Sequence, residues 1–278
     1  MTLYIVATPI GNLEDISARA LRILKEADAC YAEDTRHTAG LFRHFGIQTP
    51  LQSYHDHSSP KEIDALLDRL HQGENIALVS DAGTPCISDP GYTVVRRAHE
   101  AELRVEVVPG PSALTAFLSG AGLPTDRFTF IGFLPNKAKA RQDALQACVA
   151  RGGTTVAYES PKRLEKTLTA LYELSPDAEV VVARELTKMH ETWVRGTADT
   201  VRRALEAAEG WRGEIVLGIY APPTTIQDRE LDAWIDALLD AQLRPSHVAK
   251  TLAQRLSLPK KQVYQRALTR ADGREYNG

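Results

Sequence analysis

Cysteine is scarce in this sequence, and its placement excludes two kinds of structural support. The 278 residues include three cysteines, which are Cys30, Cys86 and Cys148. Their number is odd, they lie far apart, and no two of them form a Cys-x-x-Cys pair. This scatter argues against a disulfide framework and against a structural zinc site, and it is typical of a reducing compartment.

Long apolar runs and a strong net charge are also missing. No segment approaches the roughly 20 apolar residues of a membrane-spanning helix, and the opening MTLYIVATPIGN lacks the cationic start of a secretion signal. We therefore expect a cytoplasmic protein that does not contact a membrane. The net charge of −3 excludes a uniformly basic surface but leaves room for local basic patches.

What is present is a globular composition in which two patterns alternate. Hydrophobic residues make up 43% and charged residues 25% of the chain, which is ordinary for a protein with buried cores. Nearly continuous apolar runs alternate with helical patterns, which predicts an α/β fold whose first sheet is largely parallel. The runs that we interpret as strands are residues 3–7, 76–80, 104–108, 128–133, 154–158, 180–183 and 214–219.

Changes in pattern along the chain predict three domains. Residues 109–124 combine glycines and prolines with one short helical pattern, and we place a boundary there. The segment APPTTIQD, residues 221–228, interrupts both periodicities and is interpreted as a linker. We therefore expect an α/β domain over residues 1–115, a second α/β domain over 116–222 and a basic, helix-turn-helix-like domain over 226–278.

Three loops rich in glycine and proline each follow a predicted strand. They are TPIGN, SDAGTPCISDPGY and PGPSA. Because ligands bind beyond the carboxyl ends of parallel strands, the loops together indicate one shared pocket, although each alone would be read as a tight turn. Gly11, Gly83 and Gly110 would let backbone amides approach a ligand closely. Neither GxGxxG nor GxxxxGK[ST] occurs in them, so the loops favour a neutral or cationic ligand over a dinucleotide or a triphosphate.

These loops resemble the motifs of a known superfamily. With AEDTRHT, GFLP, YESPKRL and ARELTK, they are similar in order and spacing to the ribosomal small subunit methyltransferase I family of the tetrapyrrole methylase superfamily. The resemblance covers nearly the whole chain. It implies two α/β domains with a largely parallel first sheet and a mixed second sheet, S-adenosylmethionine bound between them, and a homodimer. It also implies methylation of the ribose 2′-oxygen of a cytidine in the decoding region of 16S rRNA.

The resemblance assigns residues to the cofactor. Members of the superfamily tend to have Gly-Asp-Pro where this chain has Gly83, Thr84 and Pro85, so Asp81 or Asp89 would have to supply the carboxylate. The residues that we expect to bind the cofactor are Pro9, Ile10, Asp81, Gly83, Thr84, Ile87, Ser112, Ala113, Tyr158 and Glu159.

A ribose hydroxyl needs a base or a cation before it attacks a methyl group. The charged residues of AEDTRHT and ARELTK are candidates for these roles. Our interpretation is that Asp34 or Glu33 acts as the base or orients it, and that Arg36 clamps the substrate. The alternative is that Asp34 and Thr35 cap the following helix and that Arg36 forms a structural ion pair.

We expect no metal ion in this chemistry. His55, Asp56 and His57 lie on one short extended segment, and no ligand from another segment is indicated that would complete a metal site. A structural or RNA-facing role is therefore favoured over a metal site. Cys86 lies inside the second loop, but no neighbouring histidine marks it as a nucleophile, which favours packing.

The end of the chain is basic although the whole protein is acidic. Residues 244–270 contain seven lysines and arginines and no acidic residue, over two helical patterns separated by Ser257, Leu258 and Pro259. Phosphates of RNA are the expected partners, and the alternative is a solvated helical cap that supports a dimer. A second basic segment, NKAKAR, follows GFLP. The predicted RNA-binding residues are Lys137, Lys139, Arg141, Lys250, Lys260, Lys261 and Arg266.

These observations favour an RNA methyltransferase whose partner is 16S rRNA or the small ribosomal subunit. A methyltransferase for a tetrapyrrole or a protein side chain is the first alternative, and a phosphate-binding tail argues against it. A non-catalytic RNA-binding assembly factor is the second alternative, and cofactor binding would exclude it. A nucleotide hydrolase is disfavoured because the sequence has no phosphate-binding loop.

Overall fold

The computed structural model describes residues 1–278 except 56–57, 209–210, 223–227, 257 and 276–278. It consists of two compact units, residues 1–223 and 224–278. The first unit contains both sheets, and its division at residue 115 remains a prediction. The predicted linker and the start of the predicted third domain fall largely on residues 223–227, outside the described residues.

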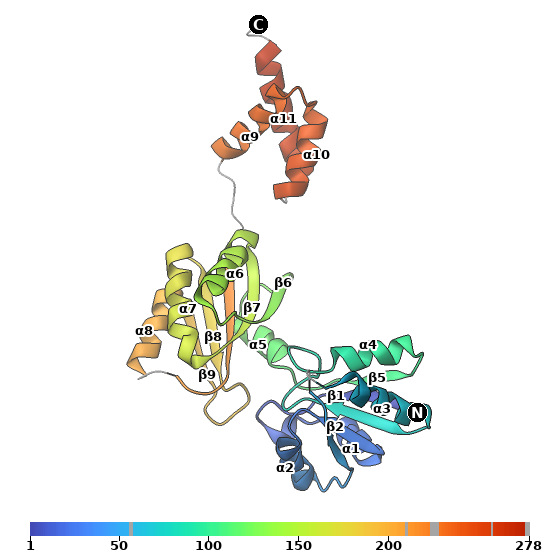
Figure 1. The fold of residues 1–278 in the computed structure, drawn as a ribbon. Helices are drawn as coiled ribbons and strands as arrows, with labels where there is room; N and C mark the ends of the chain where they lie inside the picture. Colours follow the sequence, from blue (N-terminus) through green and yellow to red (C-terminus); the bar gives the residue numbers. More distant parts are fainter. Residues whose placement is uncertain (56–57, 209–210, 223–227, 257, 276–278) are drawn as a thin grey trace. The chain divides into compact units, whose positions relative to one another are not determined.

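The first sheet has five strands in the order β3-β2-β4-β1-β5, and every pair of neighbours is parallel (Figure 1). The strands β1, β2 and β4 are buried almost throughout, which explains their continuous apolar sequences. In chain order the strands are Thr2–Val6 (β1), Ala29–Ala32 (β2), Leu51–Ser53 (β3), Asn75–Val79 (β4) and Val105–Val108 (β5).

Helices cover both faces of this sheet. On one face Leu3 and Ile5 pack with α3 and α4, and on the other Val6 and Cys30 pack with α1 and α2. The helices are Ala18–Glu26 (α1), Thr35–Phe45 (α2), Pro60–His71 (α3) and Tyr92–Glu100 (α4), with a short 3₁₀ helix, Leu13–Asp15 (η1), before α1. A capping box of Ser59 and Glu62 starts α3 at Pro60. The predicted parallel α/β arrangement is confirmed.

The second sheet has the order β6-β7-β10-β8-β9 and is mixed, as predicted. Only the β6–β7 pair is parallel among its described ladders, and the other three pairs are antiparallel. The strands are Phe128–Phe133 (β6), Gly153–Glu159 (β7), Glu179–Arg184 (β8), Thr192–Thr197 (β9) and Ile215–Ala221 (β10).

The two faces of the second sheet are covered by helices from different parts of the chain. Three helices, Ala138–Arg151 (α6), Pro161–Leu174 (α7) and Ala198–Ala207 (α8), pack on one face through Leu145, Leu168 and Val201 (Figure 1). On the other face lies Ala113–Ala121 (α5), whose Phe117 is fully buried against the strands. A β-carbon at Gly218 would come within 2.6 Å of Phe117, so this glycine makes room for the ring.

The second unit is a bundle of three helices, Asp228–Asp240 (α9), Pro245–Leu256 (α10) and Lys260–Glu275 (α11). Its core contains Ile235, Val248, Leu252, Val263 and Ala267. The helices α10 and α11 are the predicted pair, and α9 adds a third. In the described part of the chain no helix is both long and apolar enough to cross a membrane.

Candidate functional site

The loops after β1, β4 and β5 line a cavity of about 530 Å³ together with residues of the second sheet. Four loops meet at this edge because the carboxyl ends of parallel strands lie side by side, and the fourth contributes Glu33 after β2. The lining includes nine of the ten residues predicted for the cofactor, namely Ile10, Asp81, Gly83, Thr84, Ile87, Ser112, Ala113, Tyr158 and Glu159. Pro9 is buried beside them and does not line the cavity.

The glycines of the loops serve packing between loops. Thr8 and Gly83 exchange two backbone hydrogen bonds of 2.8 and 3.0 Å. A β-carbon on Gly83, whose φ is +84°, would lie 3.2 Å from Ile10, and one on Gly110 would lie 3.0 Å from Ala7. These glycines therefore let the loops pack closely on one another, and Gly83 also lines the cavity. The approach of their backbone amides to a ligand remains a prediction.

Gly11 faces a loop of the second sheet. Its β-carbon would lie 2.8 Å from Thr187 Oγ1 and 3.0 Å from the Leu186 carbonyl oxygen. The adjacent Asn12 donates its backbone N–H to Thr187 Oγ1 at 3.1 Å. Glycine in TPIGN therefore allows the first loop to rest on residues 185–191, which connect β8 to β9.

The second loop holds a strained backbone. Cys86 and Ser88 have φ values of 70° and 63°, a left-handed conformation that is unfavourable for residues other than glycine. A β-carbon on Gly91 would lie 2.6 Å from Cys86 Sγ, so the thiol is packed against the end of its own loop. Strain of this kind is characteristic of binding loops, and Ser88 itself lines the cavity.

The cavity is acidic. Its lining carries five carboxyl groups and, among the described residues, no lysine, arginine or histidine. The carboxyl groups belong to Glu33, Asp81, Asp89, Glu159 and Glu214. Such a lining is electrostatically suited to a cation and unsuited to a polyphosphate.

One of these carboxylates is occupied by the protein. Glu159 is 2% exposed, and its Oε1 accepts hydrogen bonds from Ser160 N at 2.6 Å and from two guanidinium nitrogens of Arg163 at 2.8 and 2.6 Å. Its Oε2 accepts the hydroxyl of Thr167 at 2.7 Å. This carboxylate anchors the start of α7, so any contact with a ligand would have to come from the Glu159 backbone.

The Glu33–Arg36 segment contributes one residue to the cavity lining and another to the N-terminal cap of α2. Glu33 lines the cavity, whereas Asp34 is the N-cap of α2 and accepts the backbone N–H of Arg36. The Arg36 guanidinium also forms a two-pronged ion pair with Asp34, with N–O distances of 3.0 and 2.8 Å. Hydrogen bonds from Arg36 hold the pKa of Asp34 down to about 2. Asp34 and Arg36 therefore have the geometry of the capping alternative, and their catalytic role remains a prediction.

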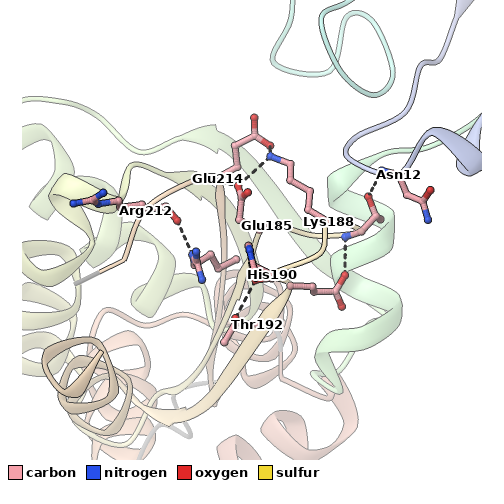
Figure 2. A network of polar contacts seen from close by, with 10 residues as sticks. Asn12, Glu185, Lys188, His190, Thr192, Arg212 and Glu214 are labelled. Atoms are coloured by element: carbon pink, nitrogen blue, oxygen red, sulfur yellow. Dashed lines mark hydrogen bonds and ion pairs between the residues drawn. The ribbon is translucent and has the colours of Figure 1, made fainter. Parts of the chain in front are cut away.

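A polar network next to the cavity was only partly foreseen (Figure 2). Lys188 Nζ lies 3.0 Å from Glu185 Oε1 and 3.1 Å from Glu214 Oε2, which joins the β8–β9 loop to the residue that precedes β10. Partial burial works against the Lys188 charge, but the two carboxylates raise its pKa overall. Arg184 donates to the Arg212 carbonyl oxygen at 2.6 Å. The motif ARELTK therefore shapes the wall of the cavity at Leu186 and Glu214.

Several lining residues were not identified from the sequence. They are Ala82, Ser88, Phe133, Ser160, Pro161, Leu186, Gly213, Glu214, Ile215 and Val216. Ser160 and Pro161 stand in YESPKRL and Phe133 in GFLP, so the quoted motifs were the available signal. Burial and the charge of Asp89 raise the pKa of Tyr158, which keeps this lining residue a neutral phenol.

The predicted RNA-binding residues fall into two groups. Lys137, Lys139, Lys250, Lys260 and Lys261 are exposed. Two arginines do not fit the prediction. Arg141 is 6% exposed and donates to the carbonyl oxygens of Pro135 and Asn136, and Arg266 forms a two-pronged ion pair with Asp232 at 2.6 and 3.1 Å.

The pairing of Arg266 also changes how the basic tail is interpreted. Arg270 contacts Asp232 and Asp236 in the same way, so α9 supplies the acidic partners that residues 244–270 lack. The exposed basic residues among the described part of the second unit are Arg244, Lys250, Arg255, Lys260 and Lys261. Of the His55 cluster, Asp56 and His57 lie outside the described residues.

Comparison with known proteins shows which family the chain resembles in sequence. Residues 2–202 match the tetrapyrrole (corrin/porphyrin) methylases. Ribosomal RNA small subunit methyltransferase I of Xylella fastidiosa is 46% identical over 266 residues, which cover 95% of this chain and 97% of that protein. The protein of the same name from Synechocystis sp. is 45% identical over 277 residues, which cover 98% and 99%.

A solved structure agrees with the fold. Uroporphyrin-III C-methyltransferase from Thermus thermophilus, complexed with S-adenosyl homocysteine, matches with a TM-score of 0.53 and 21% identity over 79% of this chain and 97% of that one. The chain belongs to the ribosomal RNA small subunit methyltransferase I family of the tetrapyrrole methylases.

Proposed function

We propose that this protein is an rRNA methyltransferase that uses S-adenosylmethionine to methylate the ribose 2′-oxygen of a cytidine in the decoding region of 16S rRNA. Membership of the family supports the rRNA substrate, since the relatives are named for small-subunit rRNA. The observation that carries the proposal is the acidic cavity formed by four loops at one edge of the parallel sheet.

The residues present fit the cofactor. When bound, S-adenosylmethionine supplies an electrophilic methyl group on a positively charged sulfur. A lining with carboxylates and no described basic side chain suits this charge. Ile10, Thr84, Ile87 and Ala113 would hold the cofactor, and the carboxylates of Asp81 and Asp89 would complement its positive charge.

Glu33 is the residue best placed to accept the proton of the ribose 2′-hydroxyl. It lines the cavity, whereas the Asp34 carboxylate is engaged by Arg36 and has a pKa of about 2, which makes it a weak base. Asp81 accepts the backbone N–H of Asp34 at 2.8 Å and so ties the segment after β2 to the loop after β4. We assign the proton to Glu33, and to Asp34 the positioning of this segment.

RNA phosphates would be held outside the acidic cavity. Lys137 and Lys139 are exposed at the start of α6, and Lys250, Lys260 and Lys261 are exposed on the helical unit. Two separate groups of lysines suit a large folded RNA better than a small molecule. We also propose that the small ribosomal subunit is the substrate and that the active form is a homodimer. Sedimentation of the purified protein tests the dimer.

Methyl transfer to ribosomal subunits tests the proposal. Labelled S-adenosylmethionine is incubated with 30S subunits from cells that lack this protein, and the product is mapped by resistance of the 2′-O-methylated linkage to alkali. Label at one cytidine 2′-oxygen is the expected result. Label on a base, or none with protein that binds the cofactor, would refute the proposed reaction and favour a tetrapyrrole or protein substrate.

A further inference from the structure

An aromatic ring stands exposed at the mouth of the cavity. Phe133 lines the cavity, yet 62% of its surface is exposed. Its ring packs edge-to-face on Tyr158, with the centroids 5.3 Å apart and the planes at 64°. Tyr158 in turn packs on Phe130 at 5.0 Å, so the exposed ring rests on an aromatic support.

A bulge in β6 sets the position of this ring. Phe130 pairs with Val156, and Phe133 pairs with Tyr158, so β6 contains one more residue than β7 between these pairs. In a regular ladder Gly132 would stand opposite Tyr158 and the cavity would have no ring there. Bulges commonly redirect a side chain next to an active site. Gly132, with a φ of 63°, makes the bulge possible, and its β-carbon would lie 3.0 Å from Ser88 Oγ.

The stability of the sheet gives no reason for an exposed phenylalanine at this place. The next residue, Leu134, is 1% exposed and belongs to the core beneath α6 and α7. Phe130 already packs against Tyr158. An exposed large ring that lines a cavity is the kind of apolar surface that marks a binding site.

The charges around Phe133 indicate which ligand it meets. The carboxylates of the cavity repel phosphates, whereas Lys137 and Lys139 follow four and six residues later on the same segment. Both lysines are exposed and form no ion pair among the described residues. An exposed ring followed closely in the chain by exposed lysines has the two features that bind an unpaired nucleotide, a surface on which the base stacks and cations that neutralise the backbone.

We propose that Phe133 is the platform on which the base of the substrate nucleotide stacks, with Lys137 and Lys139 on the phosphates beside it. This inference rests on the proposed function. It adds that the target nucleotide is unpaired when it reacts, because a base within a helix presents no free face to a ring.

Three variants of the full-length protein test the platform. Phe133→Ala removes the ring, Phe133→Trp keeps a larger one, and Phe128→Ala is the control because Phe128 is 45% exposed on the same strand but does not line the cavity. The KM for 30S subunits lacking the modification and the Kd for S-adenosylmethionine are measured for each. Thermal unfolding verifies that the variants are folded.

We expect Phe133→Ala to raise the KM for 30S subunits about tenfold or more, as loss of one base–aromatic stack does, with the cofactor Kd unchanged. Phe133→Trp should stay within about threefold of the wild type, and Phe128→Ala should behave as the wild type. An unchanged KM in Phe133→Ala overturns the platform and leaves the proposed function intact. A parallel loss of cofactor affinity would assign the ring to the cofactor and also overturns it. A wild-type protein that methylates no 30S subunit refutes the proposed function, and the platform with it.

Discussion

Gly11 rests directly on the backbone of Leu186, so that a β-carbon at Gly11 would lie 3.0 Å from the Leu186 carbonyl oxygen. The two residues are far apart in sequence, and the contact joins the first loop to the β8–β9 loop that lines the cavity. The φ of Gly11 is not positive, so space alone requires a glycine here.

Gly11→Ala should therefore destabilise the protein by about 1–3 kcal/mol, the usual cost of an added methyl group in a packed site. It should also weaken S-adenosylmethionine binding, because Leu186 must move. Gly40→Ala is the matched control, since a β-carbon at Gly40 meets nothing within 4 Å and alanine favours the helix by roughly 0.5–1 kcal/mol. Denaturant unfolding and cofactor titration measure both effects. Equal behaviour of the two variants would contradict the packing role of Gly11.

The contact at Gly11 is an example of a feature that could be predicted from the sequence only in part. Most of the buried strands were predictable because strands covered on both faces have continuous apolar sequences, although the short buried strand β2 is not among the predicted runs. The edge strands β3 and β9 were not predicted, since LQS and TWVRGT are partly exposed and have no apolar run. The motif around Gly11 pointed to the site, but its partner 175 residues away is set by the tertiary fold.

The pairing of charges between helices and the bulge in β6 are two further features that could not be predicted from the sequence. Counting the charges of residues 244–270 predicted a basic surface, but Arg266 is held by Asp232 of a preceding helix. The sequence contains both residues and gives no sign that they meet. Phe133 was overlooked as a site residue because strand periodicity does not reveal the extra residue that places it opposite Tyr158.

Glu33→Gln should lower kcat about 100-fold or more, the usual contribution of a general base, with a smaller effect on cofactor binding. Asp34→Asn should lower kcat less than about tenfold, because a carboxylate with a pKa of about 2 is a poor proton acceptor. Single-turnover methylation of 30S subunits measures both. A severe defect in Asp34→Asn with a mild one in Glu33→Gln would reverse the assignment.

The pH dependence of stability gives a second test of Asp34. Its pKa is lowered from 3.8 to about 2 in the folded protein, so its ion pair with Arg36 contributes fully above pH 3.8 and is lost as the pH falls toward 2. Between pH 5 and 8 the pair should thus cause no change in melting temperature. The difference in melting temperature between the wild type and Asp34→Asn should shrink below pH 4. A difference that stays constant down to pH 2 would contradict the lowered pKa.

Glu159→Gln should act mainly on stability. The buried carboxylate accepts four hydrogen bonds, two of them from Arg163, and an amide would leave the guanidinium without a full counter-charge. We expect a loss of about 3 kcal/mol or more in the free energy of unfolding, and Thr167→Val should lose about 1.5–3 kcal/mol. Cofactor affinity measured well below the melting temperature should change little. A large loss of affinity in a stable Glu159→Gln protein would show that the side chain binds the cofactor.

The two kinds of basic residue in the helical unit should respond differently to mutation. Lys260 and Lys261 are exposed, so replacing both with glutamine should weaken RNA binding and reduce its salt dependence by about 0.7 for each lost contact to a single-stranded phosphate. Arg266→Gln should instead lower the melting temperature of this unit, because Asp232 loses the hydrogen bonds that lower its pKa. The Asp232–Arg266 ion pair contributes its full stabilisation of the folded unit above pH 3.8, and this stabilisation is lost as the pH falls through the lowered pKa of Asp232.

Filter binding at several salt concentrations and thermal unfolding separate the two effects. The lysine variant should melt as the wild type does and should bind RNA with a shallower salt slope. The arginine variant should retain the wild-type slope at temperatures where it is folded, since its guanidinium is already neutralised by Asp232. If Arg266→Gln lowered the salt slope as much as the lysine pair does, its ion pair would have to open on RNA. The lysines would then share the phosphate contacts with an arginine that the free protein uses to hold α11 to α9.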